Sequence, residues 1–147
     1  MMSAYKDIAT QLLKNAIVHG IENTEERTHK HKDITGQITL NLSEDAKNQK
    51  LTIKDDGAGI NWEKIRQKAV EIGQATTDTA HNLTQKDLVR IMFLSGVSTA
   101  KTVDEDAGRG VGMDIIKALA NKYHAKIGVS SKADHFTQIS ITFPKNI

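Results

Sequence analysis

The chain has 147 residues, a mass of 16.2 kDa and a hydrophobic content of 38%, which suffice for one domain around one core. Lys and Arg number 20 against 18 Asp and Glu, and the net charge of +2 gives no electrostatic reason to expect a nucleic-acid or membrane partner. The absence of cysteine excludes disulfides and thiol chemistry, and no apolar run reaches the roughly 18 residues of a membrane span. We therefore expect a single cytoplasmic domain over residues 1–147.

Hydrophobic periodicity predicts the first elements in chain order. Apolar residues at helical spacing indicate a helix over 5–20, and the polar, aperiodic stretch 21–36 indicates an exposed loop. Alternating apolar and polar residues then predict strands over 37–43 and 50–56, joined as a hairpin. We expect the apolar positions of this hairpin to form one buried face, namely Ile38, Leu40, Leu42, Leu51 and Ile53.

Capping signals mark two further helices. Asn61 is a candidate N-cap, and Thr84 with Asp87 is a candidate capping box. The remaining elements are a helix over 61–73, a mobile segment over 74–82, a short helix over 84–93, a helix over 113–124 and strands over 126–131 and 136–144. Helices packed on one face of a mixed, mostly antiparallel sheet predict an α+β fold, a two-layer α/β sandwich.

Three glycines at 108, 110 and 112 stand directly before the helix predicted over 113–124. Glycine lets the backbone approach a ligand closely, and the first amides of a helix attract anions. A phosphate cradle is therefore one interpretation, and an ordinary helix-entry turn is the other. The stretch is neither a Walker loop, which needs a following Gly-Lys-Ser/Thr, nor a Rossmann fingerprint, which needs a preceding strand.

A second short stretch, IKDDGAGI at 53–60, leads from a strand into an acidic, glycine-rich turn. Taken alone it favours an ordinary turn, since Asp and Gly are frequent turn residues. The order of the pieces is more specific: an Asn on the first helix, DDGAGI, FLSGVSTAK and GRGVGMD follow one another. This order resembles the N, G1, F and G2 boxes of the histidine-kinase-like ATPase superfamily (GHKL), which has the Bergerat-type ATP-binding fold.

Within that superfamily the chain resembles the ATP-binding catalytic domain of CheA-type chemotaxis histidine kinases. LLKNAIVHGIE, EER, FLSGVSTAK and GRGVGMDII carry the resemblance, which extends over essentially the whole chain. It implies a site for ATP and Mg²⁺, and donation of the ATP γ-phosphoryl group to a histidine on a separate domain in two-component signal transduction. It also implies that residues 1–147 are a fragment of a longer kinase whose other domains meet chemoreceptors and adaptor proteins.

The resemblance assigns the nucleotide site residue by residue. Asp55 would accept a hydrogen bond from the adenine amine, and Gly57 and Gly59 would let the chain pass close under the base. Asn15 would offer its amide oxygen to Mg²⁺, and His19 would reach the phosphates. The further nucleotide-binding residues implied are Ile60, Lys64, Lys68, Ser98, Thr99, Gly108, Arg109, Gly110, Val111, Gly112, Met113 and Thr137.

Two pairs of side chains have a plainer alternative. Lys64 and Lys68 lie four residues apart, so they share a helix face that could be merely solvated. His29 and His31 in the run HKHK could bind a metal, but a solvated loop is the favoured interpretation.

Three positions depart from the family pattern. Gln11 stands where CheA-type domains usually carry a histidine and the related ATPases a glutamate, and glutamine cannot take up a proton at neutral pH. We therefore assign no catalytic residue. Val18 replaces an aspartate, and Phe136 replaces a glycine, so that Phe136 either crowds the adenine or packs in the core.

The sequence thus predicts a protein-histidine kinase domain that binds ATP and Mg²⁺. Two alternatives remain open: a degenerate nucleotide-binding or docking module without turnover, and an ATP-hydrolysing switch of the gyrase and MutL kind. Gln11 disfavours the switch, since hydrolysis there depends on a glutamate base. Phosphotransfer to an added phosphoacceptor domain would separate kinase from module, and steady phosphate release would indicate the hydrolase.

Overall fold

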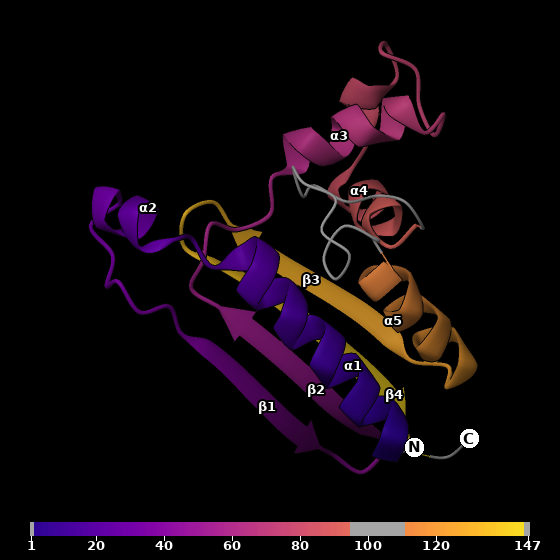
Figure 1. Cartoon of the computed structure of the whole chain (residues 1–147). Coiled ribbons are helices and arrows are strands. Elements are labelled where there is room, and N and C mark those ends of the chain that lie inside the picture. Colours follow the sequence, from indigo (N-terminus) through magenta and orange to yellow (C-terminus); the bar gives the residue numbers. More distant parts are fainter. Residues whose placement is uncertain (1, 95–110, 146–147) are drawn as a thin grey trace. The chain divides into compact units, whose positions relative to one another are not determined.

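A computed structural model describes the backbone of residues 2–94 and 111–145 (Figure 1). The chain forms two compact units, one from Met1–Ile60 with Ile115–Ile147 and one from Asn61–Asp114. The first unit contains a four-stranded sheet with helices, and the second is built from helices. None of the described helices is long and apolar enough to cross a membrane.

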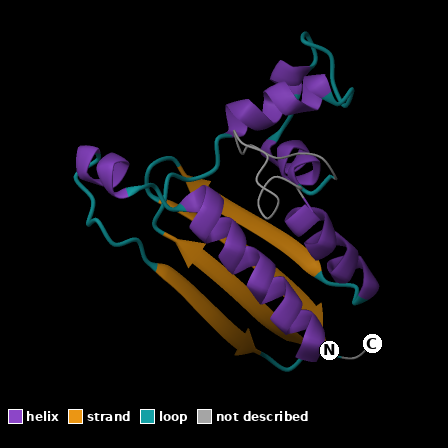
Figure 2. Cartoon of the chain, in the orientation of Figure 1, coloured by secondary structure: helices purple, strands orange, loops and turns teal. Residues whose placement is uncertain are grey.

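The sheet of the first unit has four strands in the order β1-β2-β4-β3, and each neighbouring pair is antiparallel (Figure 2). The strands are β1 (Ile38–Glu44), β2 (Asn48–Asp55), β3 (Lys126–Lys132) and β4 (Phe136–Pro144). The predicted hairpin of β1 with β2 is confirmed, and so are the two strands near the end of the chain. The long-range pair of β2 with β4 joins the two halves of the sequence into one sheet.

Two helices lie against one face of this sheet (Figure 1). They are α1 (Met2–Asn15) and the part of α5 (Val111–Lys122) that belongs to the first unit. The buried apolar side chains come from both layers: Ile8, Leu12, Leu51, Ile53, Ile116, Ala120, Ile139, Ile141 and Phe143. Tyr5 of α1 packs edge-on against Phe143 of β4, with ring centroids 4.7 Å apart. The helix layer on the sheet confirms the predicted α+β fold with two layers.

The expectation of a buried face is wrong for strand β1. Leu40 and Leu42 are 50% and 61% exposed, although their partners Ile53 and Leu51 on β2 are buried. β1 is the edge strand, and helix α1 packs over β2. Alternation therefore predicted which residues share a face, but not that the described helices leave the edge of that face uncovered.

The expectation of an exposed loop over 21–36 is also wrong. This stretch contains helix α2 (Thr24–His29), whose N-cap Asn23 accepts a hydrogen bond from the Glu26 N–H at 2.8 Å. Two charged side chains of the stretch, Glu22 and Arg27, are buried. Hydrophobic periodicity could not indicate this segment, because its buried residues are charged and pair with one another.

In the second unit, the caps predicted for its two main helices are confirmed. α3 (Trp62–Glu71) begins where Asn61 Oδ1 accepts a hydrogen bond from the Lys64 N–H at 3.1 Å. α4 (Gln85–Met92) begins with a complete capping box, in which Thr84 and Asp87 exchange hydrogen bonds of 3.0 and 3.2 Å.

Segment 74–82, which we predict to be mobile, ends in a short 3₁₀-helix, η2 (Ala80–Asn82). Arg66 of α3 donates hydrogen bonds to the carbonyl oxygens of Ala80 and Leu83, at 3.3 and 3.1 Å. These bonds tie the end of the segment to α3 within the second unit. Its mobility stays a prediction.

Removing the capping box should weaken the second unit. We expect Thr84→Ala to lower the free energy of unfolding by about 1 kcal/mol, because the Asp87 N–H loses the hydroxyl oxygen to which it donates. Gln85→Ala, one residue further on and exposed, should change it by less than about 0.5 kcal/mol. Urea unfolding of the two variants measures the difference, and equal losses would contradict a stabilising role of the cap.

Candidate functional site

A buried carboxylate closes strand β2. Asp55 is its last residue and is 5% exposed, because the alternation that buries Leu51 and Ile53 points Asp55 to the same face. Its Oδ1 accepts a hydrogen bond from the Gly57 N–H at 2.9 Å. A charged group therefore lies at the end of an apolar row, where the chain leaves the sheet.

Asp55 belongs to a polar row that crosses three strands. Its partner on β4 is Thr137, and the partner of Thr137 on β3 is Ser131, so the three side chains share one face. Ser131 Oγ accepts a hydrogen bond from the Ile60 N–H at 2.7 Å and donates one to the Phe136 carbonyl oxygen at 3.1 Å. Thr137 was predicted from the sequence, whereas Ser131 was not, because its place beside Thr137 depends on strand register.

The end of the first helix lies on the Asp55 carboxylate. After α1 the chain widens into a π-helix, η1 (Ala16–Gly20), in which the Ile21 N–H donates to the Ala16 carbonyl oxygen at 2.8 Å. A Cβ atom on Gly20 would lie 2.8 Å from Asp55 Oδ2. Only glycine fits so close to this oxygen, and no described residue donates a hydrogen bond to it.

The two glycines of the DGAGI turn pack against the backbone of the chain itself. A Cβ atom on Gly57 would lie 1.9 Å from the Gly20 carbonyl oxygen, which also accepts a hydrogen bond from the Ala58 N–H at 2.9 Å. Gly59 has a φ of +79°, and a Cβ there would lie 2.6 Å from the Lys132 carbonyl oxygen. Both positions thus need glycine before any ligand is considered, and their predicted role under a base stays a prediction.

Burial makes the charge on Asp55 costly. Desolvation raises the pKa of its carboxyl above the usual range, and the nearby Asp56 and Glu22 carboxylates act in the same direction. The Gly57 N–H and the Lys32 ammonium group oppose this rise. Because the folded-state pKa is raised, ionised Asp55 reduces stability at neutral pH, and a buried carboxylate with such a perturbed pKa is a functional-site candidate.

Five charged side chains next to the DGAGI turn contact one another, and we call them the charge cluster: Glu22, Arg27, Lys30, Lys32 and Asp56. Arg27 is 1% exposed and contacts Glu22 Oε1 at 3.0 Å and Asp56 Oδ2 at 3.1 Å. The ammonium groups of Lys32 and Lys30 contact Glu22 Oε2 at 2.7 and 3.1 Å. The charge cluster therefore fixes α2 and the segments around it to the DGAGI turn.

Glu22 is the centre of the charge cluster. Burial alone would raise its pKa, but hydrogen bonds from Lys32 and Lys30 lower the pKa of Glu22 to about 2. Glu22 is therefore ionised at neutral pH, and Arg27 is compensated in its buried position. Glu22 and Arg27 stand in the motifs HGIE and EER, but the sequence alone indicated a structural role for neither residue.

The other predicted residues near the first helix are placed as follows. Asn15 ends α1, and His19 lies in η1, where its side chain is exposed but partial desolvation lowers the pKa of its imidazole, so that it is neutral at pH 7. Gln11 lies on α1, one turn before Asn15, and Val18 is half exposed on η1. Asn15 and His19 thus lie at the end of the first helix, directly before Gly20, which packs on Asp55.

Phe136 fits neither of the two roles expected for it. Its β4 neighbour Thr137 shares a face with Asp55, so Phe136 points to the opposite face of the sheet. There the Lys54 ammonium group lies 4.8 Å from the centroid of its ring. Phe136 therefore neither crowds the Asp55 side nor packs in the core.

Part of the predicted site belongs to the second unit or lies outside the described residues. Lys64 and Lys68 lie on α3 in the second unit, where Lys68 forms an ion pair of 3.0 Å with Glu71. Val111, Gly112 and Met113 belong to the first turn of α5. Ser98, Thr99, Gly108, Arg109 and Gly110 lie outside the described residues. The predicted phosphate contacts of all these residues stay predictions.

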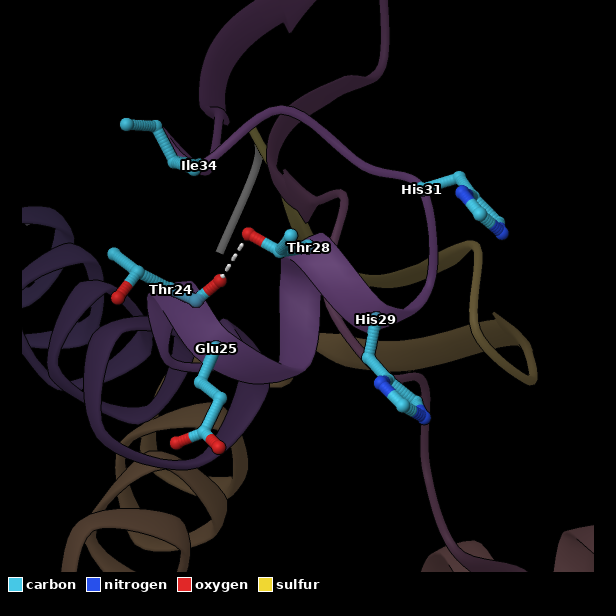
Figure 3. A pocket seen from close by; sticks show the side chains of 6 residues that line it. All are labelled: Thr24, Glu25, Thr28, His29, His31 and Ile34. Atoms are coloured by element: carbon cyan, nitrogen blue, oxygen red, sulfur yellow. Dashed lines mark hydrogen bonds between the residues drawn. The ribbon is translucent and has the colours of Figure 1, made fainter.

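A shallow hollow beside α2 contains none of the predicted site residues (Figure 3). Its lining consists of Thr24, Glu25, Thr28, His29, His31 and Ile34. The Thr28 hydroxyl, which donates to the Thr24 carbonyl oxygen at 2.8 Å, is turned inward along the helix rather than toward a ligand. The part of the chain that the structure describes holds no group of His, Cys, Asp and Glu suited to a metal, so the metal alternative for His29 and His31 gains no support.

Comparison with known proteins identifies the family. Residues 4–147 match the Histidine kinase-, DNA gyrase B-, and HSP90-like ATPase family. The match extends well beyond half of the chain and includes both the Asp55 turn and the helix end above it. The chain belongs to this family.

The curated relatives are mostly chemotaxis proteins. Chemotaxis protein CheA of Halobacterium salinarum is 32% identical over 147 residues, 100% of this chain and 22% of that protein. Chemotaxis protein CheA of Salmonella typhimurium is 35% identical over 94% of this chain and 20% of that protein. The gliding motility regulatory protein of Myxococcus xanthus is 30% identical over 100% of this chain and 19% of that protein. The chain spans about a fifth of the length of these relatives.

A solved structure agrees on the fold. The histidine kinase domain of a blue-light activated histidine kinase from Erythrobacter litoralis matches with a TM-score of 0.53 at 15% identity. The match covers 96% of this chain and 46% of that one. At this identity it supports the architecture of the chain and nothing about its chemistry.

Proposed function

We propose that the chain is the ATP-binding catalytic domain of a CheA-like histidine kinase, with both units belonging to one domain of a longer cytoplasmic protein. The observation that carries the proposal is the Asp55 carboxylate, which is buried where β2 meets the end of the first helix and whose Oδ2 accepts no hydrogen bond from a described residue. A buried acceptor that costs stability when charged suits a ligand that donates an N–H group.

Adenine offers such a donor in its exocyclic amine. Asp55 Oδ2 would accept this hydrogen bond, while Oδ1 stays bonded to the Gly57 N–H and keeps the carboxylate oriented. Thr137 stands beside Asp55 on the same face and would add a hydroxyl that can donate or accept. Gly57, Gly59 and Ile60 would form the floor under the base.

The phosphate end of the nucleotide needs positive charge and oxygen ligands. Asn15 offers an amide oxygen that suits Mg²⁺, a hard cation usually shared between protein oxygens and phosphates. When bound, Mg²⁺ would neutralise part of the phosphate charge. Neutral His19 would donate to a phosphate oxygen, and Lys64, Lys68 and the amides of the glycine-rich stretch would carry the remaining charge.

The reaction we propose is transfer of the γ-phosphoryl group to a histidine on another domain. A ring nitrogen of that histidine forms a bond to the γ-phosphorus, the bond from the γ-phosphorus to the β–γ bridging oxygen breaks, ADP leaves, and the imidazole proton passes to water. The acceptor supplies its own nucleophile, so the chain needs no general base. Gln11, which cannot take up a proton, is compatible with this reaction and unsuited to activating water.

Phosphotransfer to a separate acceptor tests the proposal. The chain would be mixed with γ-labelled ATP, Mg²⁺ and the histidine phosphoacceptor domain of its parent protein. We expect acid-labile, alkali-stable label on the acceptor, which is lost when the acceptor histidine is replaced. Steady release of inorganic phosphate without labelled acceptor would contradict the kinase and favour an ATPase switch, and neither product from a chain that binds ATP would favour a docking module.

Nucleotide affinity should depend on pH through Asp55. Protonation removes the negative charge of the acceptor, and burial raises the pKa of Asp55, so affinity should fall as the pH drops through this raised pKa. The loss therefore begins at a higher pH than for an ordinary aspartate, whose pKa is near 3.8. Calorimetric titration with ADP between about pH 7.5 and 4.5, with circular dichroism to verify folding, measures the midpoint. An affinity that stays constant while the chain remains folded would contradict an ionised Asp55 in the site.

A further inference from the structure

The side chain of Lys32 binds the backbone of the turn that follows Asp55. Its ammonium group donates to the carbonyl oxygen of Asp56 at 3.0 Å and to that of Gly57 at 2.9 Å. Its third contact is Glu22 Oε2 at 2.7 Å. An ammonium group has three donors, so the two backbone contacts and the ion pair together use its full capacity.

These contacts fix the peptide groups that orient the Asp55 carboxylate. The Gly57 N–H holds Asp55 Oδ1, and the Gly57 carbonyl oxygen is held by Lys32, so both sides of this glycine are anchored. The side chain of the intervening Asp56 is anchored as well, because its Oδ1 accepts from the Gln37 N–H at 2.9 Å and its Oδ2 contacts Arg27. The whole turn from Asp55 to Gly57 is thus held by partners outside it.

We propose that Lys32 is a positioning residue of the nucleotide site: its ammonium group holds the carbonyl oxygens of Asp56 and Gly57 and thereby sets the orientation of the Asp55 carboxylate. The inference rests on the proposed function, because it assigns Lys32 a role in binding the adenine of that same site.

The charge of Lys32 supports this role as well. Among the described residues, the groups that act on the Asp55 carboxyl by charge are Asp56 of its own turn, Glu22 after η1, and Lys32 after α2. The two carboxylates raise the pKa of Asp55, and Lys32 is the cation that lowers it. Loss of Lys32 would therefore leave Asp55 beside two negative charges without this compensation.

Lys30 provides a matched control from the same segment. Its ammonium group also contacts Glu22 Oε2, at 3.1 Å, and its other partner is Asp134 at 2.7 Å. Unlike Lys32, it has no hydrogen bond to the described backbone of the Asp55 turn. Lys30→Met thus removes one positive charge and one contact to Glu22, as Lys32→Met does. It leaves the hydrogen bonds from Lys32 to the Asp56 and Gly57 carbonyl oxygens in place.

The experiment follows Asp55 itself and its ligand. Asp55 Cγ would be titrated by ¹³C NMR in the nucleotide-free chain and in Lys32→Met, Lys32→Arg and Lys30→Met, and ADP affinity would be measured by calorimetry at pH 7.5. We expect Lys32→Met to raise the pKa of Asp55 and to weaken ADP binding by about tenfold. Lys32→Arg should restore most of both properties, since it keeps the charge, and Lys30→Met should leave both close to those of the parent chain.

The two readouts separate the possible failures. If Asp55 titrates alike in Lys32→Met and Lys30→Met and ADP binds equally to both, the positioning role of Lys32 is wrong. If Lys32→Met does not fold, a failure of Lys32→Arg to restore the parent titration and affinity would overturn it in the same way. If the folded parent chain binds no ADP, the proposed function fails instead, and the role of Lys32 in nucleotide binding fails with it.

Discussion

Asp55→Asn should bind ADP at least about tenfold more weakly than the parent chain, while unfolding at the same or a higher temperature. Asparagine keeps an oxygen for the Gly57 N–H, so the local hydrogen bond survives. It also removes a carboxylate whose pKa is raised by burial. Such a carboxylate destabilises the folded state once the pH exceeds its raised pKa and it becomes ionised. At neutral pH the substitution therefore relieves a cost of folding and removes the charged acceptor for adenine.

Calorimetric titration with ADP and thermal unfolding of the same samples measure the two effects. Asp7→Asn is the matched control, because it makes the same change in charge at an exposed position of α1. It should alter neither property. A large loss of stability in Asp55→Asn would mean that the carboxylate has a structural role, and unchanged ADP affinity would place the adenine contact elsewhere.

Gly57→Ala should lower the free energy of unfolding by about 3 kcal/mol. The added Cβ atom would lie 1.9 Å from the carbonyl oxygen of Gly20, a backbone atom that cannot move aside like the end of a side chain. Either the end of η1 or the DGAGI turn has to shift, and both border Asp55. Nucleotide binding should therefore be lost together with stability.

Gly73→Ala separates this clash from backbone strain. Gly73 has a φ of +79°, but a Cβ atom there meets nothing within 4 Å. We expect a loss of about 1 kcal/mol from the left-handed conformation alone, with ADP affinity unchanged. Urea unfolding compares the two variants, and equal losses would argue against close packing of Gly57 on the helix end.

The sequence predicted the elements whose signals are local. The caps Asn61 and Thr84 with Asp87 could be recognised because the N-cap bond joins residues three apart. Alternation likewise revealed the strands, since it depends on neighbouring residues. It failed for the burial of Leu40 and Leu42, because the position of a strand at a sheet edge is a property of the whole fold.

The candidate site was predictable where its motifs are contiguous. Asp55 and its glycines stand in one short stretch, whereas Ser131 reaches the same turn from a distant strand whose register the sequence does not reveal. Four members of the charge cluster, Glu22, Arg27, Lys30 and Lys32, were missed for a different reason. Their polar segment was interpreted as a solvated loop, and charged residues that bury one another leave no hydrophobic pattern.

The central claim is that the Asp55 site binds adenine nucleotides. Its most direct test is a calorimetric titration of the parent chain with a non-hydrolysable ATP analogue, with and without Mg²⁺, beside the matching GTP analogue. Guanine carries a carbonyl oxygen where adenine carries its exocyclic amine, and an ionised Asp55 would repel it. We predict saturable binding of the ATP analogue that Mg²⁺ strengthens and that exceeds GTP binding by at least about tenfold. Equal affinity for both analogues, or no binding by the folded chain, would contradict the claim.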